Sequence, residues 1–171
     1  MNSAELDKLI EMAAQGDINA LEGIYAETRT SVYSYALSIL KDPTEAEDVL
    51  HDCYIRIFKG ASGYSSQGKP LAWIFTITRN LCLKVLKDSQ NRVDLTEEEW
   101  NEKLESFDDL TTEEKTVLKD CLSKLSEDEQ QIVTMHALTG YKHREIAEIL
   151  GIPLSTVLSK YNRAIAKLQK M

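Results

Sequence analysis

The side chains best placed to do chemistry lie near the C-terminal end of the sequence, on the outer side of an expected helix. Short hydroxyls and cations share that side, at Ser155, Thr156, Ser159, Lys160 and Arg163. Such groups can reach base edges and phosphates when a helix lies in the major groove of DNA. The same spacing also fits an ordinary helical hairpin with a solvated polar face, and the spacing alone leaves both interpretations open.

Two short amphipathic helices must position these side chains. In the stretch "YKHREIAEILGIPLSTVLSKYNRA", the apolar residues recur at the spacing of one buried helix face. Gly151 can adopt the left-handed conformation that ends the first helix, and Pro153 presets the first turn of the second. The expected core positions are Ile146, Ala147, Leu150, Val157, Tyr161 or Ile165, and Leu168.

Catalytic and metal-binding constellations are not indicated. The histidines have no partnered nucleophile or ligand cluster, and there is no phosphate-binding or dinucleotide-binding glycine motif. The cysteines form no CxxC pair, so small buried apolar residues are the better interpretation. We therefore expect no enzyme, no cofactor and no metal site. These residues are His51, His136 and His143, and Cys53, Cys82 and Cys121.

Charge is distributed unevenly along the 171 residues, whose formal net charge is -8. Residues 1–87 carry 9 basic and 11 acidic side chains, residues 88–114 carry 2 and 11, and residues 115–171 carry 9 and 6. The acidity is thus concentrated in the middle, and the C-terminal part is mildly basic. A globular composition, no basic-then-apolar leader and no long apolar run predict a cytoplasmic protein without membrane insertion.

The rest of the chain has helical periodicity and no strand-like alternation. Asp42 is expected to cap a helix that begins at Pro43 and buries Ala46, Val49 or Leu50, Cys53 and Ile57. Residues 60–70 have a loop composition. Residues 71–87 form a helix with one apolar stripe and a mixed second stripe. That second stripe comprises Trp73, Thr76, Ile77, Asn80, Lys84 and Lys87.

An all-α fold follows, with two small helical domains joined by an acidic linker. The expected boundaries are 1–87 for the first domain, 88–111 for the linker and 112–171 for a helix-turn-helix domain. Within the linker, a capping box at Thr96 and Glu99 precedes an apolar stripe of Trp100, Leu104 and Phe107. That segment could fold as a helix, dock on a neighbour or stay disordered. Ser126 and Glu129 form a second capping box.

The sequence resembles the extracytoplasmic function (ECF) group of bacterial sigma factors. The stretch "YKHREIAEILGIPLSTVLSKYNRAIAKL" resembles their promoter-reading helix-turn-helix. The stretches "GDINALEGIYAET", "DPTEAEDVLHDCYIRIF" and "PLAWIFTITRNLCLKVLK" resemble consecutive helices of their other domain, in order. The resemblance covers roughly residues 16–87 and 125–168. It implies a dissociable initiation subunit that binds core RNA polymerase and directs it to promoter DNA.

The resemblance also implies roles for individual residues. The helix from Ala46 to Lys59 would face the polymerase clamp through Glu47, Asp48, His51, Asp52 and Arg56; the alternative is a solvated charged face. The loop 60–70 and the following helix would capture melted bases of the minus-ten element, with Asn80 on a base edge and cations on phosphates. Trp73 could instead belong to the core. The set is Ser62, Tyr64, Lys69, Trp73, Thr76, Arg79, Asn80, Lys84 and Lys87.

The second domain would read the minus-thirty-five element. Its implied contacts are Lys142, Ser155, Thr156, Ser159, Lys160 and Arg163. Leu158 stands where relatives usually carry a basic residue, and Lys84 where many carry an acidic or amide residue. These departures leave the promoter sequence open.

Partners also follow by similarity. The acidic linker would complement a basic channel of the polymerase, or else be a solvated tether. The resemblance also implies an anti-sigma protein as a partner, and the free chain is expected to be a monomer or 1:1 with that partner. The main rival is a stand-alone helix-turn-helix regulator that binds a palindromic site as a homodimer, and a second rival is a module that binds only proteins.

Overall fold

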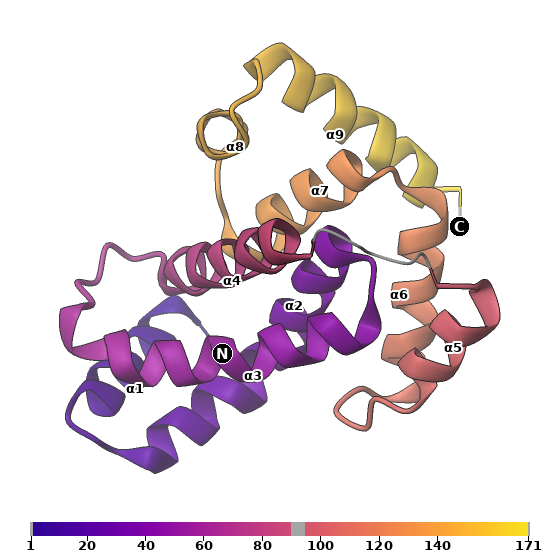
Figure 1. Cartoon of the computed structure of the whole chain (residues 1–171). Coiled ribbons are helices and arrows are strands. Elements are labelled where there is room, and N and C mark those ends of the chain that lie inside the picture. The colour runs from indigo at the N-terminus through magenta and orange to yellow at the C-terminus, as the bar shows by residue number, and fades with distance from the viewer. Residues whose placement is uncertain (1, 90–94, 171) are drawn as a thin grey trace. The chain divides into compact units, whose positions relative to one another are not determined.

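The computed structural model describes residues 2–89 and 95–170, and within these residues the secondary structure is helical, with connecting turns and loops and no strand, as predicted. The chain divides into two compact units, residues 1–109 and residues 110–171 (Figure 1). The first contains α1 (Ser3–Ala14), α2 (Ile18–Leu40), α3 (Pro43–Gly60), the 3-10 turn η1 (Ala61–Gly63), α4 (Pro70–Asp88) and α5 (Glu97–Glu105). The second contains α6 (Thr112–Lys124), α7 (Glu127–Thr139), α8 (His143–Leu150) and α9 (Leu154–Leu168). No helix among the described residues is long and apolar enough to span a membrane.

The core of the first unit is built around α2, which packs against α1, α3 and α4. Tyr35 of α2 is completely buried, and its ring lies 4.7 Å from that of Phe75 on α4. Large side chains at the centre make this core costly to disturb, since truncating a buried aromatic leaves a cavity. Because α2 contacts both α3 and α4, and these two helices also contact each other, the core places α3 and α4 side by side.

The start of α3 follows the sequence prediction. The Asp42 carboxylate accepts hydrogen bonds from the backbone N–H groups of Thr44 and Glu45, and Pro43 occupies the first turn. This cap satisfies donors that have no partner inside the helix. The predicted inward positions of α3 are all buried: Ala46, Val49, Leu50, Cys53 and Ile57.

The acidic segment from Thr96 to Asp109 packs on the first unit. Thr96 and Glu99 form the predicted capping box that starts α5. After α5, Phe107 is buried and its ring stacks on that of Tyr33 at a centroid distance of 4.0 Å. Leu104 is also buried, and the Lys103 ammonium lies 3.6 Å from the Asp42 carboxylate. Residues 90–94 of the predicted linker lie outside the described residues.

The second unit is a set of short capped helices. The Ser126 hydroxyl accepts from the Glu129 N–H at the start of α7, which is the second predicted capping box. Gly151 ends α8 in the left-handed region at φ 66°, and the Ile152 N–H donates to the Ala147 carbonyl at 3.1 Å. This ending turns the chain into α9 within a few residues. The first helix thus ends at Gly151, as predicted, and Pro153, which was expected in the first turn of the second helix, is the N-cap residue of α9, just before Leu154.

Most of the expected core positions of this pair are buried or half-buried. Ile146, Ala147 and Val157 are buried, and Tyr161 is half-buried, with its ring edge-to-face against two histidines that stack on each other, His136 and His143. The histidine rings lie 4.4 Å apart. Burial, and then the neighbouring His136, lower the pKa of His143 below its ordinary value.

The cysteines differ in their surroundings. Cys53 and Cys82 are buried, and burial raises the pKa of each thiol to about 12. Neither thiol is therefore a thiolate nucleophile at neutral pH. Cys121 is only half-buried, so the expectation that all three cysteines are buried is wrong at this position. It lies on α6, a short helix of a small unit with less core to cover it.

Candidate nucleic-acid interface

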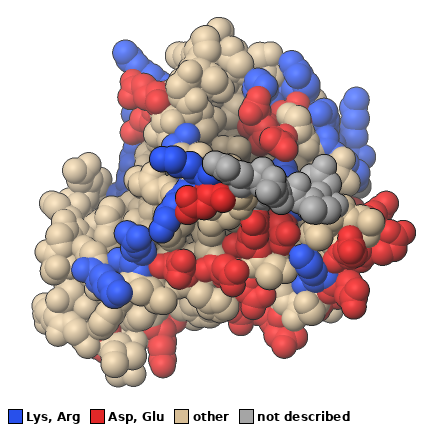
Figure 2. All heavy atoms as spheres, in the orientation of Figure 1, with Lys and Arg blue, Asp and Glu red and all other residues tan. Residues whose placement is uncertain are grey.

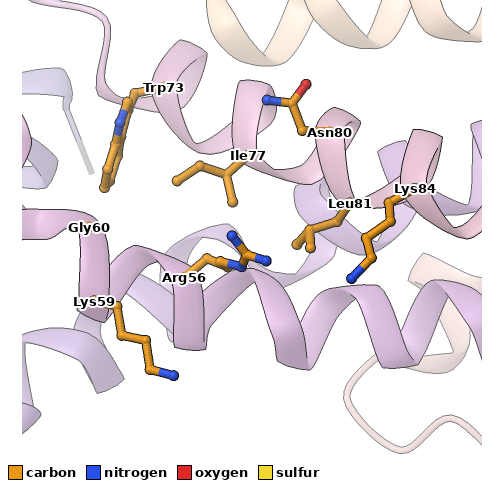
Figure 3. Close-up of a pocket in the computed structure, with 8 residues that line it drawn as sticks. All are labelled: Arg56, Lys59, Gly60, Trp73, Ile77, Asn80, Leu81 and Lys84. Atoms are coloured by element: carbon orange, nitrogen blue, oxygen red, sulfur yellow. The ribbon is translucent and has the colours of Figure 1, made fainter.

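A cavity of about 610 Å³ opens between the end of α3 and the middle of α4 (Figure 3). Its volume is within the range of small-molecule sites. Arg56, Lys59 and Gly60 come from α3, and the remaining lining residues come from α4. Those residues are Trp73, Ile77, Asn80, Leu81 and Lys84.

The lining combines three kinds of group that suit a nucleotide. The Trp73 ring and Ile77 provide an apolar wall on which a flat base can lie. Asn80 is exposed at the rim and offers both an amide donor and an acceptor. Lys59 and Lys84 place positive charge on the two sides of the opening, within reach of a phosphate.

The cavity brings together only part of the predicted minus-ten set. Trp73, Asn80 and Lys84 line it, as members of the mixed stripe of α4. Arg56 also lines it, although the sequence placed Arg56 with the polymerase-facing residues. Lys59 was not predicted at all. The available signal was its position three residues after Arg56, on the exposed face at the end of α3.

The other predicted minus-ten residues lie outside this lining. Thr76 is exposed, but its hydroxyl donates to the Ala72 carbonyl at 2.9 Å within α4. Lys87 is exposed, and Lys69 and Arg79 are half-buried, with Lys69 just before α4. Ser62 is exposed in η1.

Tyr64 anchors the loop beside the cavity. Its ring lies 4.7 Å from the Trp73 ring, and its hydroxyl donates to the Asp7 carboxylate of α1. Burial, and then this hydrogen bond to Asp7, raise the pKa of Tyr64. The hydroxyl is therefore engaged within the protein, and Tyr64 fixes Trp73 in place where the sequence had suggested a direct DNA contact.

Weakening the hydrogen bond between Tyr64 and Asp7 should make the Trp73 wall of the cavity more mobile without unfolding the protein. In Asp7→Asn, the Tyr64 hydroxyl loses a charged acceptor, a bond worth about 1.5–3 kcal/mol. We expect faster motion of the Trp73 ring, seen as a fall in its fluorescence anisotropy in a Trp100→Phe background. Asp17→Asn, which alters a helix cap far from the loop in sequence, is the control. Unchanged anisotropy in Asp7→Asn would contradict the anchor.

The residues predicted to face the polymerase form an exposed acidic surface on α3. Asp48, His51 and Asp52 are exposed, and Glu47 is half-buried. Ile55, which the sequence did not single out, is exposed beside them. Figure 2 shows basic side chains over α4 and the C-terminal end of α3, and acidic side chains over the rest of α3 and over α5. One helix thus carries two surfaces of opposite charge.

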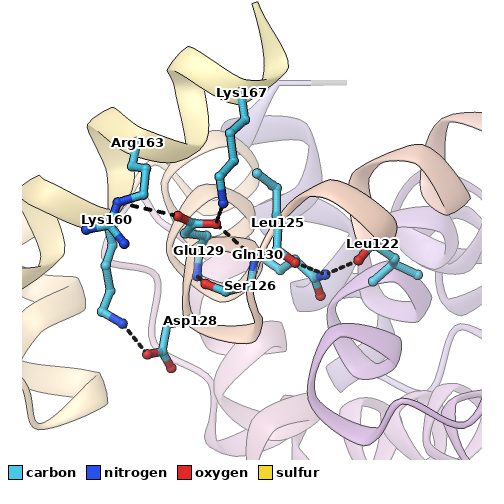
Figure 4. Close-up of polar contacts among 9 residues, drawn as sticks. All are labelled: Leu122, Leu125, Ser126, Asp128, Glu129, Gln130, Lys160, Arg163 and Lys167. Atoms are coloured by element: carbon cyan, nitrogen blue, oxygen red, sulfur yellow. Dashed lines mark hydrogen bonds and ion pairs between the residues drawn. The ribbon is translucent and has the colours of Figure 1, made fainter. Parts of the chain in front are cut away.

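In the second unit, the predicted cations of α9 are held by acidic side chains of α7 (Figure 4). The Lys160 ammonium bonds to the Asp128 carboxylate at 2.5 Å. Arg163 Nε lies 3.9 Å from Glu129, and the Lys167 ammonium bonds to Glu129 at 2.7 Å. The pairing reduces the charge that Lys160 and Arg163 present to solvent. Lys142 is exposed at the start of α8.

The hydroxyls of α9 are placed as predicted, but the exposed face contains more than hydroxyls. Ser155 and Ser159 are exposed, and Thr156 is half-buried. Leu154, Leu158 and Asn162 share the exposed face and were not among the predicted contacts. Helical periodicity alone could have placed them there, since they lie four residues apart.

Glu129 is the most deeply buried charged residue among the described residues of the second unit, with 1% of its side chain exposed. Burial raises the pKa of this carboxyl, but hydrogen bonds from Lys167 and Ser126 outweigh burial, and the net pKa lies below the ordinary value of 4.5. Gln130 beside it donates to the Leu122 and Leu125 carbonyls and ties α6 to α7. The α7–α9 junction therefore depends on an ionised Glu129.

The lowered pKa gives the second unit a definite pH dependence. A depressed carboxyl pKa contributes stability above pH 4.5, and this stability is lost as pH falls through the folded-state pKa. We expect Glu129→Gln to cost about 2 kcal/mol at pH 7, because two cations lose their charged partner. The variant should lose less stability than wild type below pH 4.5, as measured by urea unfolding. Glu127→Gln, an exposed neighbour, is the control; equal acid sensitivity of Glu129→Gln and wild type would contradict this role.

Comparison with known proteins covers both units. Residues 24–92 match the family model for sigma-70 region 2, and residues 115–168 match the model for sigma-70 region 4. The ECF RNA polymerase sigma factor SigK of Mycolicibacterium vanbaalenii is 26% identical over 175 residues, covering 98% of this chain and 89% of that protein. The ECF RNA polymerase sigma factor BldN of Streptomyces coelicolor is 27% identical over 176 residues, covering 99% and 67%.

Two solved structures share the fold. One is CnrH in complex with the cytosolic domain of CnrY, with a TM-score of 0.59, 21% identity and coverage of 97% of this chain and 96% of that chain. The other is the sigma factor RpoE in complex with the anti-sigma factor NepR from Bartonella quintana, with a TM-score of 0.57, 18% identity and coverage of 90% and 96%.

Proposed function

We propose, from the premise that this chain belongs to the ECF group of the sigma-70 family, that it is an alternative sigma factor. It binds core RNA polymerase and directs the enzyme to specific promoters. The observation that supports this proposal is that one chain combines a cavity lined by Trp73, Asn80 and cations in the first unit with a helix-turn-helix in the second. Polymerase performs the chemistry, and the chain chooses the site.

The first unit is proposed to act at the minus-ten element. An unstacked base enters the cavity between α3 and α4, lies on Trp73 and pairs its edge with Asn80. Arg56, Lys59 and Lys84 then hold the adjoining phosphates. Arg56 thereby moves from the polymerase-facing set to the DNA-facing set. The acidic surface of α3, at Glu47, Asp48, His51 and Asp52, remains the proposed polymerase contact.

The second unit is proposed to read the minus-thirty-five element through α9. The number of exposed cations on the two DNA surfaces is small, and Lys160 and Lys167 are bonded to α7. Because each neutralised phosphate adds to affinity, we expect the free chain to bind duplex DNA weakly. Polymerase raises the effective concentration of each unit at its element. The chain therefore works in the cytoplasm as a 1:1 subunit.

An anti-sigma protein is a further proposed partner. Support comes from the two solved neighbours of the same fold, since RpoE is bound to the anti-sigma factor NepR and CnrH to the cytosolic domain of CnrY. Such a partner would explain how a subunit of this kind is kept off polymerase. Co-purification of the tagged chain from its own cells, before and after stress, would identify it.

Run-off transcription tests the proposed function. Core polymerase with this chain should initiate at discrete promoters that core polymerase alone ignores. Size-exclusion chromatography should show the free chain as a monomer. A stand-alone regulator predicts the opposite pattern: a homodimer that binds a palindromic duplex tightly without polymerase. A module that binds only proteins would join polymerase but leave its choice of promoters unchanged.

A further inference from the structure

Two exposed leucines lie at the beginning of α9. Leu154 is 41% exposed and Leu158 is 40% exposed, four residues apart and hence on one face of the first two turns. The N-terminal residues of the second helix in a helix-turn-helix are the ones that meet base edges. An apolar pair therefore occupies the place where sequence is read.

The groups around this pair are short and uncharged. Ser155 and Ser159 flank the leucines, and Asn162 follows one turn later on the same face. The single cation of the first two turns, Lys160, is bonded to Asp128 of α7 at 2.5 Å. The leading part of α9 thus presents aliphatic and hydroxyl surface, with its positive charge turned toward α7.

Base edges in the major groove offer few partners for a leucine. Guanine, cytosine and adenine present hydrogen-bonding atoms there, and thymine adds a C5-methyl group. A leucine placed against O6, N7 or N4 would remove water from those atoms without replacing its hydrogen bonds, which is unfavourable. The thymine methyl is the apolar group on a base edge that a leucine can bury with a favourable change in free energy.

We propose that Leu154 and Leu158 select thymine in the upstream promoter element by packing on its methyl groups. This inference rests on the proposed function and names the base that the second unit prefers. Asn162 extends the preference, because its amide fits the N6 and N7 atoms of adenine. The upstream element is therefore expected to contain A·T pairs opposite the first half of α9.

A protein partner fits this patch less well than DNA does. Stable protein interfaces bury about 800 Å² on each partner around an apolar centre. Two partly exposed leucines surrounded by Ser155, Ser159 and Asn162 do not provide such a centre. The hydroxyls beside them can reach base edges or phosphates.

Removal of single methyl groups from DNA tests the proposal. Core polymerase with the full chain would first select promoters from a duplex library randomised at both elements. In one selected promoter, each thymine of the upstream element would then be replaced by deoxyuridine, which keeps every hydrogen bond and lacks the methyl. We expect about fourfold weaker promoter binding for each methyl that a leucine covers.

Variants of the chain assign the effect to the leucines. With Leu158→Ala, the thymine promoter should bind about fourfold more weakly, and one deoxyuridine replacement should have no further effect. Val117→Ala, which truncates another exposed apolar residue of the same unit, should keep the full sensitivity to deoxyuridine. Because the substituted side chains are exposed, the fold should be unchanged, and the melting temperature checks this.

Three results would overturn the proposal. They are selected elements without thymine, equal binding of thymine and deoxyuridine promoters by the wild-type chain, and loss of core polymerase binding in Leu158→Ala. Failure of the proposed function would give a different result, because no library member would then support polymerase-dependent initiation. That result would overturn the thymine preference as well.

Discussion

Asn80→Ala should lower promoter opening about 10- to 100-fold and leave binding to core polymerase unchanged. The expectation follows from the cavity, where the Asn80 amide at the rim is the neutral group that can donate to and accept from a base edge. Because Asn80 is exposed, its truncation should not change the melting temperature. Open complexes can be counted by permanganate footprinting, and core binding by native gel.

A premelted template separates base capture from strand separation. On a promoter whose minus-ten element is already mismatched, the Asn80→Ala defect should persist, because the lost bond is to the unstacked base. Leu86→Ala is a matched control: it truncates an exposed residue of α4 that does not line the cavity. Full recovery of Asn80→Ala on the premelted template would show that Asn80 serves melting and does not bind the base.

Phe107→Ala should release the acidic segment from the first unit. Phe107 is 3% exposed and stacks on Tyr33, so its truncation removes a buried aromatic contact worth about 3 kcal/mol or more. We expect amide hydrogen exchange in α5 to become over about 100-fold faster. Hydrogen exchange followed by mass spectrometry measures α5 and α2 in the same sample.

The comparison with α2 makes this result specific. The exchange rates of amides at the centre of α2 should change far less than those of α5, since the Tyr35–Phe75 core is untouched. Glu98→Ala, an exposed substitution on α5 itself, should change exchange little. Undiminished protection of α5 in Phe107→Ala would mean that other contacts, such as Lys103 with Asp42, hold the segment.

The sequence was sufficient to predict features that depend on residues close together along the chain. The caps at Asp42, Thr96 and Ser126 were predictable because a side-chain oxygen bonds N–H groups two or three residues away. Buried helix faces followed from a period of 3.6 residues. The turn at Gly151 was predictable for the same reason, since its left-handed geometry favours glycine.

Features that depend on distant residues were not predictable. Lys59 and Arg56 join Asn80 because α3 and α4 pack side by side, and no local pattern gives that packing. The pairing of Lys160 and Arg163 with α7 depends on residues more than thirty positions away. Likewise, the stripe of Trp100, Leu104 and Phe107 left open whether the segment is a helix, docks on a neighbour or is disordered, because the ring that receives Phe107 belongs to α2.

The packing of Phe107 on the first unit limits the distance that can separate the first unit from the second. While Asp109 is held against the first unit, only residues 110 and 111 separate it from α6, a stretch of less than about 10 Å. If the segment detaches, the 23 residues from Ser89 to Thr111 could extend to roughly 75 Å. The stacking of Phe107 on Tyr33, together with the hydrogen bond from Tyr25 to Asp109 and the ion pair of Lys103 with Asp42, thus limits the distance between the two DNA-reading elements, and a longer distance requires these contacts to break.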